Sequence, residues 1–449
     1  MIHSYKVIPD EAVVSAELRE DANKRAKYKM LRVGIWVYFI LLIFEGALRK
    51  WVFPGLATPL LIIRDPVAAW LIILALHNSL LKPNIYLTGI CIITVISIFT
   101  TLFIGHGNLY VALFGARVFL LHFPLIFVIG RVFERKDVIF MGKVILAIAV
   151  PMTILIAIQF YSPQSAWVNR GIGEGSEGGG FSGALGFFRP PATFSFITGT
   201  ASFFSLVGCF IFYFWLSANR INRILLAAAT ISLMASIPLS ISRSLFFGVV
   251  LSLVFAIMAI LRKPEYLGKL LLGLFVGTAI FLTFSDNPAV KAPIEAFTTR
   301  FTSANEAEGG LKGVAGDRFL GGMFDAIVGS SDQPFFGYGL GMGTNVGAML
   351  LSGKSVFLIS EGEWGRLTGE QGPLLGLLVI ILRVLFCIQL LIAAYRRLQI
   401  KDLLPWMLLN FALINIAQGQ WGQPTSLGFS VVIGGLMLAS FKKSAHKGF

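Results

Sequence analysis

The feature that most constrains the fold of this chain is a succession of long apolar segments separated by short polar connections. A helix needs about 20 apolar residues to cross the hydrocarbon layer of a bilayer. Of the 449 residues, 56% are hydrophobic and only 13% are charged, whereas a soluble domain carries about 25% charged residues. The sequence therefore predicts an all-α polytopic membrane protein.

About twelve spans are predicted, nine of them within 33–284 and three within 373–441, with a large loop at 285–372 between helices 9 and 10. Residues 1–32 and 442–449 are predicted to form cytoplasmic tails. The apolar runs lie near 33–53, 59–80, 84–104, 109–130, 138–160, 192–216, 222–241, 244–261, 267–284, 373–394, 403–418 and 426–441.

The basic residues predict which connections face the cytoplasm. Lysine and arginine are enriched in cytoplasmic loops, and a cytoplasmic N-terminus places every strongly basic connection on that side. Shifting the alternation by one helix would move all of these charges outside, so both termini are expected to be cytoplasmic. The residues concerned are Lys82, Arg131, Arg135, Lys136, Arg220, Arg223, Arg262, Lys263, Lys269, Arg396, Arg397, Lys401, Lys442, Lys443 and Lys447.

Composition also argues against several classes of function. The formal charge of +14 lies at the ends of apolar segments, where it acts as a topology signal, so no nucleic-acid partner is expected. The three cysteines, Cys91, Cys209 and Cys387, lie in apolar runs without metal-type spacing, and the histidines form no HExxH pattern. We therefore expect no metal and no cofactor.

Two connections on the predicted outer side are long. Residues 161–191 are rich in glycine and contain Glu174 and Glu177, a composition that fits a flexible linker. Residues 285–372 contain the apolar runs 319–328 and 346–351, which favour a folded lid over disorder. Loops of this length are usually functional or disordered.

Three arginines lie on the outer side, against the charge rule: Arg189, Arg243 and Arg318. A planar guanidinium binds phosphate oxygens in a bidentate manner and keeps its charge in a site of low dielectric constant. Converging arginines are therefore candidates for binding a diphosphate. The alternative is that each one snorkels to the interface or pairs with a nearby acid, such as Asp317 beside Arg318.

Carboxylates and an arginine also cluster where the large loop re-enters the membrane. Charges near the hydrocarbon are costly and usually functional, and these point to chemistry on a sugar or phosphate. The two glutamates Glu361 and Glu363 could also hold a divalent cation with Asp332, although two carboxylates on a short stretch are weak evidence for a metal site. The segment reads Glu361-Gly362-Glu363-Trp364-Gly365-Arg366, followed by Glu370-Gln371-Gly372.

Other polar residues have structural interpretations. Glu45 and Arg49 are spaced as a helical pair, with Lys50 beside them. Arg64 could be a helix cap whose counter-charge is Asp65, whereas Arg117 and His122 lie inside the fourth span and are ambiguous. The glycine-rich run 337–343 lacks the lysine of a P-loop, so it is interpreted as a tight turn.

Together these features resemble the O-antigen polymerase and O-antigen ligase superfamily, including Wzy-type polymerases, which are GT-C-like membrane glycosyltransferases. The resemblance covers nearly the whole chain. In one departure, Glu361 stands where family members often carry a histidine, and Trp364 takes the place of the aromatic residue that follows it. The matching segments are Arg189 to Phe194, Ser242 to Ser244, Arg318, Pro334 to Gly341 and Glu370 to Gly372.

The resemblance implies a glycosyltransferase of the bacterial inner membrane whose active site faces the periplasm. It would polymerise oligosaccharide repeat units carried on undecaprenyl diphosphate, with inversion, without a metal and together with other polysaccharide-assembly proteins. An O-antigen ligase with another acceptor is the alternative, and a polysaccharide transporter is a more distant one. Arg189, Arg243 and Arg318 would bind the diphosphate and Glu361 or Glu363 would act as base, with further substrate contacts from Arg64, Arg117, Trp364, Arg366 and Glu370.

Overall fold

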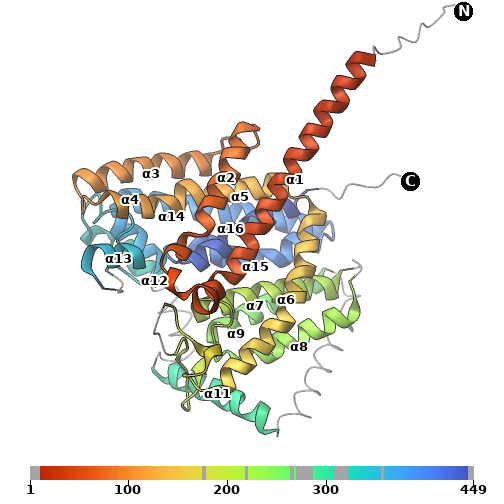
Figure 1. Cartoon of the computed structure of the whole chain (residues 1–449), viewed down its shortest axis with the longest axis vertical. Helices are drawn as coiled ribbons and strands as arrows, with labels where there is room; N and C mark the ends of the chain where they lie inside the picture. The colour runs from red at the N-terminus through yellow and green to blue at the C-terminus, as the bar shows by residue number, and fades with distance from the viewer. Residues whose placement is uncertain are drawn as a thin grey trace, which may run out of the picture.

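The computed structural model of the chain describes residues 11–173, 178–217, 221–262, 267–268, 287–307, 322–354 and 358–442. In these ranges the protein is almost entirely helical (Figure 1). The only sheet there is a short antiparallel hairpin in which β1 (Phe181–Ser182) pairs with β2 (Phe188–Arg189).

The first half contains α1 (Glu11–Ala47), η1 (Leu48–Val52), η2 (Pro54–Leu56), η3 (Pro59–Ile62), α2 (Arg64–His77), α3 (Ile85–Phe103), α4 (Leu109–Arg117), η4 (Val118–His122), α5 (Phe123–Val132), α6 (Arg135–Tyr161), η5 (Trp167–Asn169) and α7 (Ile197–Leu216). The second half contains α8 (Arg223–Leu239), α9 (Arg243–Leu261), α11 (Pro288–Ala307), α12 (Gly322–Val328), η8 (Gly329–Asp332), α13 (Asn345–Ser352), α14 (Glu363–Gln399), α15 (Leu403–Gln418) and α16 (Pro424–Ser440).

Eight of the described helical stretches are long and apolar enough to cross a membrane, and α8, α15 and α16 are shorter apolar helices. These eleven (eight plus three) coincide with eleven of the predicted spans. The remaining predicted span, 267–284, lies outside the described residues except for 267–268. The chain is therefore an all-α membrane protein, and the total of about twelve spans stays a prediction.

Two helices differ in length from the predicted spans. Helix α1 begins at Glu11 rather than near residue 33, because the polar residues before the span are mostly good helix formers such as Ala, Glu, Lys and Arg. Helix α14 begins at Glu363, ten residues before the predicted boundary at residue 373, and includes the acidic segment. The predicted loop 161–191 is also folded in its described part, where Asn169 donates hydrogen bonds to the carbonyls of Gln159 and Ser162.

The centre of the bundle is formed by α7, α15 and α16. Helices α7 and α16 are buried along most of their length, as expected for helices that are apolar all round. Helix α16 packs on α5, and α15 packs on both α14 and α7. Figure 1 shows α3, α4 and α5 above this centre, α8, α9 and α11 below it, and α6 running beside α7.

Hydrogen bonds at one end of the bundle join connections that were all predicted to be cytoplasmic. Arg135 grips Asp402 with two hydrogen bonds of 2.5 and 2.7 Å, and Arg32 donates to Glu134 at 2.8 Å. Lys442 donates to the carbonyl oxygen of Arg131 at 2.6 Å. These contacts support the predicted alternation, whereas the membrane side that this end faces stays a prediction.

The opposite end contains the long connections and is shaped by a break inside α14. Gly372 has φ 76° and ψ 174°, a conformation found almost only for glycine. The break leaves the carbonyls of Gly369 and Glu370 without helical partners, and they accept hydrogen bonds from the N–H groups of Tyr338 and Gly339 at 2.8 and 3.0 Å. The glycine-rich run thus forms the predicted tight turn and packs on residues 363–371.

The substitution Gly372→Ala should destabilise the protein more than Gly353→Ala. Both glycines have positive φ, but a Cβ at Gly372 would collide with the carbonyl of Phe335, whereas Gly353 has open space around it. We expect Gly353→Ala to cost about 1 kcal/mol and Gly372→Ala several times more. Thermal unfolding in detergent measures the difference, and equal losses would contradict the close approach at Gly372.

Candidate functional site

Arg189 is presented by the β1–β2 hairpin. Its Nε donates to the carbonyl of Ser182 at 3.1 Å, and its guanidinium lies 5.9 Å from the centre of the Phe181 ring. The side chain is half-buried. The hairpin therefore orients the guanidinium at the end of the bundle that carries the long connections, which is called the outer end after the predicted topology.

The chain that follows Arg189 is held by side chains from two other helices. Lys50 donates to the carbonyls of Ala192 and Phe194 at 2.6 and 2.9 Å, and Gln159 bonds both the N–H and the carbonyl of Ala192. Ala192 has a φ of 53°, which is unfavourable for a residue with a Cβ. Such strain persists only where surrounding contacts impose it, and it clusters at functional sites.

Arg243 begins α9, directly after the turn that joins α8 to α9. Ser242 caps this helix by accepting a hydrogen bond from the N–H of Leu245 at 3.3 Å. Ile241 has a φ of 47°, and its buried side chain packs so closely on Gly183 of the hairpin that a Cβ there would lie 2.7 Å from Ile241 Cδ1. The turn that carries Arg243 and the hairpin that carries Arg189 therefore pack together.

A third arginine, Arg300 of α11, completes this group, which we call the arginine cluster (Arg189, Arg243 and Arg300). Arg300 Nη1 donates to the carbonyl of Gly183 at 3.2 Å. Burial first, and then the charges of Arg300 and Arg243, lower the pKa of the Arg189 guanidinium to about 10. The Arg189 side chain thus remains cationic near neutral pH, and the proximity of the three guanidinium groups favours binding of a multivalent anion.

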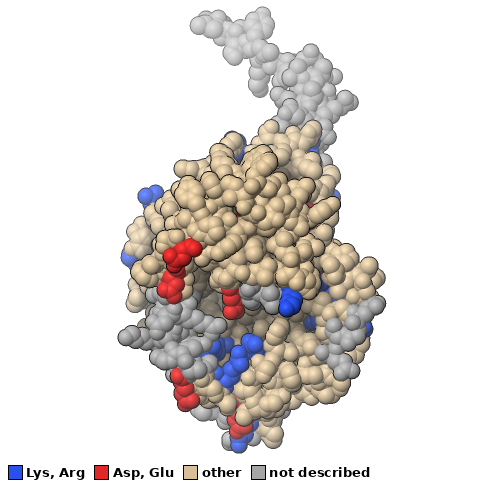
Figure 2. Space-filling model, turned by 90° about the vertical axis from the view of Figure 1, so that its left-hand side faces the viewer, with Lys and Arg blue, Asp and Glu red and all other residues tan. Residues whose placement is uncertain are grey.

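Figure 2 shows the molecule from the left-hand side of Figure 1. The surface is hollowed near the middle of this face, with basic side chains inside the hollow and acidic side chains above and below it. Basic side chains gathered in a depression raise the local concentration of anions.

The predicted trio of arginines is thus recovered in part. Arg189 and Arg243 come together as expected, whereas Arg318 lies outside the described residues. Arg300 was not singled out in the sequence, although it follows the same signal as the others. It is an arginine on the predicted outer side, in Thr299-Arg300-Phe301 of the large loop.

Glu363 lies in a buried ion network at the start of α14. Its carboxylate accepts hydrogen bonds from Arg383 Nη1 at 2.6 Å, from Arg366 Nη2 at 2.9 Å and from the N–H of Trp421 at 3.0 Å. Arg366 Nε adds a fourth at 3.0 Å, and only 4% of the residue is exposed. A carboxylate with both oxygens occupied in this way is placed to stabilise structure rather than to accept a proton.

The remaining members of the acidic segment extend this network. Arg366 Nη1 donates to Glu370 at 2.6 Å, and the other oxygen of Glu370 accepts a hydrogen bond from the N–H of Gly343 at 2.9 Å. Trp364 Nε1 donates to the carbonyl of Ala417 at 2.9 Å. These contacts pin the glycine-rich run and α15 to residues 363–371, so the geometry favours structural roles for these residues over substrate contact.

Arg383 is a member of this network that sequence reasoning missed. It is fully buried, its Nε donates to the carbonyl of Ile416 at 2.7 Å, and its guanidinium lies 3.8 Å from the centre of the Trp421 ring. The signal was present in the sequence, because a lone arginine in the middle of the apolar run 374–391 is rarely without a role.

Glu361 differs from Glu363 in its environment. Its side chain is exposed, and its backbone carbonyl accepts a hydrogen bond from Gln420 Nε2 at 2.9 Å. This contact fixes the main chain while leaving the carboxylate accessible. Of the two candidate bases, Glu361 is therefore the one that a substrate hydroxyl can approach.

Arg64 and Arg117 belong to a second buried network, which joins the outer ends of α1 and α2 to the C-terminal end of α4. Arg64 pairs with Glu45 at 3.3 Å rather than with its neighbour Asp65, which is gripped by Arg117 at 2.7 and 2.8 Å. Arg49 contacts Glu45 at 3.4 Å, which confirms the predicted helical pair. Arg64 and Arg117 are thus each paired with a carboxylate within the fold.

Comparison with known proteins does not identify the chain. No family model matches it, and no match was found among curated proteins. Among the described residues, no three His, Cys, Asp or Glu side chains gather in a group that could hold a metal ion. The arrangement of side chains is therefore the basis for assigning a function.

Glu363→Gln should act mainly on stability. Removing one partner of a buried ion pair leaves an uncompensated charge and costs about 3–5 kcal/mol. Adding Arg383→Gln to this variant should recover part of the loss, because the orphaned cation is then removed. Thermal unfolding of the single and double variants measures this. A Glu363→Gln protein with unchanged stability and no activity would instead favour a role as base.

Proposed function

We propose that this protein is a membrane glycosyltransferase that polymerises oligosaccharide repeat units carried on undecaprenyl diphosphate. The glycan would be an exopolysaccharide, a capsule or an O-antigen, and the reaction would take place on the periplasmic face of a bacterial inner membrane. The observation that carries the proposal is the arginine cluster, in which three segments distant in sequence bring Arg189, Arg243 and Arg300 together.

The arginine cluster suits the leaving group of this reaction. When the bond between the anomeric carbon and the phosphate oxygen breaks, the diphosphate gains negative charge. Preorganised cations aimed at that charge stabilise the transition state. A guanidinium also offers paired donors to phosphate oxygens, which a lysine cannot. Burial, and then the charges of Arg300 and Arg243, depress the pKa of Arg189, and a bound anion would relieve the repulsion among these like charges.

The acceptor contributes a sugar hydroxyl, which attacks the anomeric carbon from the side opposite the diphosphate. Its oxygen forms the new glycosidic bond while the bond to phosphate breaks, so the anomeric configuration inverts. The hydroxyl proton must pass to a base in the transition state. We assign this proton to the exposed carboxylate of Glu361. Glu363 then serves as the buried anion that fixes the segment.

The direct test is transfer by the purified full-length protein in nanodiscs, with undecaprenyl-diphosphate-linked oligosaccharide as the sole substrate. A ladder of products that differ by one repeat unit would support polymerisation. A single transfer that requires an added acceptor of another class would identify a ligase instead. Absence of transfer under both conditions, with a correctly folded protein, would overturn the proposal.

Arginine substitutions should separate binding from folding. Arg189→Lys, Arg243→Lys and Arg300→Lys should each lower turnover by about 10-fold or more, because a point charge does not replace the planar fork. Arg170→Lys is the matched control on the same side of the bundle. If alanine variants of Arg189 and Arg243 bind donor normally and retain turnover, the arginine cluster is not the diphosphate site.

Inorganic pyrophosphate offers a readout that does not depend on catalysis. A ligand that binds only the folded state raises the thermal midpoint, and the rise grows with the ratio of ligand concentration to Kd. Pyrophosphate should therefore stabilise the wild-type protein and have a smaller effect on Arg300→Gln. Equal stabilisation of both proteins would place pyrophosphate elsewhere.

Glu361→Gln should lower turnover by about 10²-fold or more, because the amide keeps the shape of the side chain but cannot take up the proton. Glu295→Gln, an exposed carboxylate of α11, is the control. Near-native activity of Glu361→Gln, combined with a stable but inactive Glu363→Gln, would assign the role of base to Glu363 instead.

Transfer should survive exhaustive treatment with EDTA. The arginine cluster can neutralise the leaving diphosphate, which is the work that a divalent cation otherwise does in such reactions. Loss of transfer on chelation, followed by recovery with manganese, would instead make Glu361 and Glu363 candidates for metal ligands.

A further inference from the structure

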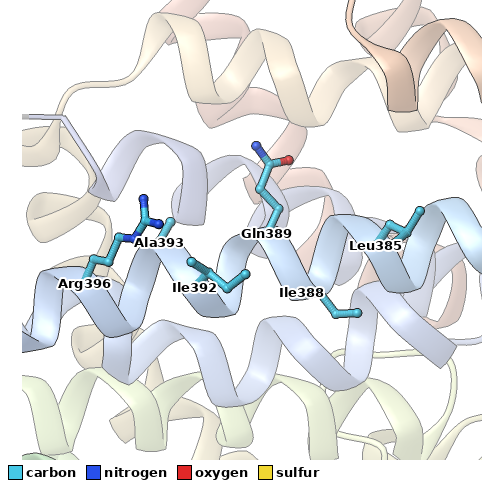
Figure 3. Close-up of a pocket in the computed structure, with 6 residues that line it drawn as sticks. All are labelled: Leu385, Ile388, Gln389, Ile392, Ala393 and Arg396. Atoms are coloured by element: carbon cyan, nitrogen blue, oxygen red, sulfur yellow. The ribbon is translucent and has the colours of Figure 1, made fainter.

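A shallow groove runs along the half of α14 nearest the end of the bundle predicted to be cytoplasmic. One hollow of about 330 Å³ is lined by Leu385, Ile388, Gln389, Ile392, Ala393 and Arg396 (Figure 3). A second hollow of about 490 Å³ shares Ile392 and Arg396 with the first and reaches Tyr395. Together they form one apolar stripe that ends at a cation, and we call it the α14 groove.

The length of the groove matches one leaflet of a bilayer. Leu385 and Arg396 are eleven residues apart in the helix, which corresponds to a rise of roughly 16 Å. The hydrocarbon layer is about 30 Å thick, so each leaflet contributes about half of that. An acyl chain lying in the groove would therefore run from the position of a headgroup at Arg396 to the middle of the membrane.

Aromatic residues mark the level of the headgroups at this end. Arg262, at the end of α9, donates to Tyr395 Oη at 2.9 Å, and the Tyr395 ring lies 6.3 Å from that of Trp406. Tyrosine and tryptophan are enriched at membrane interfaces. Arg262, which is bonded to Tyr395, and Arg396, which lines the same hollow as Tyr395, thus offer two guanidinium groups close to the interface.

Gln389 is the feature that points to a particular ligand. Its side chain is exposed in the middle of the apolar stripe, where an amide without a partner is costly. Figure 3 shows the amide of Gln389 and the guanidinium of Arg396 rising from the same side of α14. Arg396 forms no ion pair within the described ranges. The groove thus presents a cation at the headgroup level and, deeper, an amide that can donate to a carbonyl.

We propose that the α14 groove binds an anionic glycerophospholipid of the surrounding leaflet. The lipid phosphate contacts Arg396 and Arg262, one ester carbonyl accepts a hydrogen bond from Gln389, and an acyl chain packs on Ile392, Ile388 and Leu385. Basic pockets between helices on the cytoplasmic side of membrane proteins bind acidic headgroups in this way. The ester carbonyl separates this ligand from a polyprenyl phosphate, which has none.

The experiment is native mass spectrometry of the full-length protein, delipidated in detergent and titrated with dioleoyl-phosphatidylglycerol, dioleoyl-phosphatidylcholine or undecaprenyl phosphate. We expect phosphatidylglycerol to bind at least 5-fold more tightly than phosphatidylcholine. Arg396→Gln should abolish this preference, and Gln389→Leu should weaken phosphatidylglycerol but not undecaprenyl phosphate. Lys82→Gln, a basic residue at another connection on the same side, should change neither.

Several outcomes would overturn the proposal. Equal binding of the two phospholipids by the wild-type protein would mean that the groove does not select for charge. Wild-type affinity in Arg396→Gln would place the lipid elsewhere. Tighter binding of undecaprenyl phosphate than of phosphatidylglycerol, with no effect of Gln389→Leu, would identify a polyprenyl ligand. Arg397 and Lys401 remain in these variants, so the basic character of this connection is preserved.

Discussion

The arrangement of the outer end depends on the carboxylate of Glu363. This one anion joins the first turn of α14, the middle of the same helix through Arg383 and the connection between α15 and α16 through Trp421. Arg366 and Glu370 then extend the network to the glycine-rich run. Glu363, Arg366 and Arg383 are all buried, so water cannot easily replace a missing partner, and loss of one member would loosen the segments that the others hold.

Buried polar contacts also position the segments that bear the arginine cluster. Lys50 is 1% exposed, and its ammonium group donates hydrogen bonds to two carbonyls of the segment that follows Arg189. The strained backbone of Ala192 and Ile241 lies within three residues of Arg189 and Arg243, respectively. The buried Lys50 and the two strained turns thus hold the arginine cluster in place. The half-buried position of Arg189, and then repulsion from the other two arginines, lower its pKa.

Hydropathy and charge placement were sufficient to predict most spans, because hydrocarbon imposes the same composition on any helix that crosses it. The break before residue 373 was also recognisable, since Gly372 and Pro373 both interrupt helices. By contrast, Arg383 and Arg300 could be noticed in the sequence as unusual arginines, but their bonding partners Ile416 and Gly183 lie elsewhere in the chain and no local pattern reveals them. Glu361 and Glu363 look alike in sequence, yet one is exposed and the other is enclosed by cations.

The interruption at Gly372 also has a mechanical consequence. A glycine in such a conformation would normally be a hinge, but the bridge from Glu363 to Arg383 crosses it at 2.6 Å and acts as a strut. The part of α14 before the break, residues 363–371, is therefore expected to follow the part after it when that part tilts. Helices tilt to match the thickness of the bilayer, so thickness would be transmitted to the position of the outer loop.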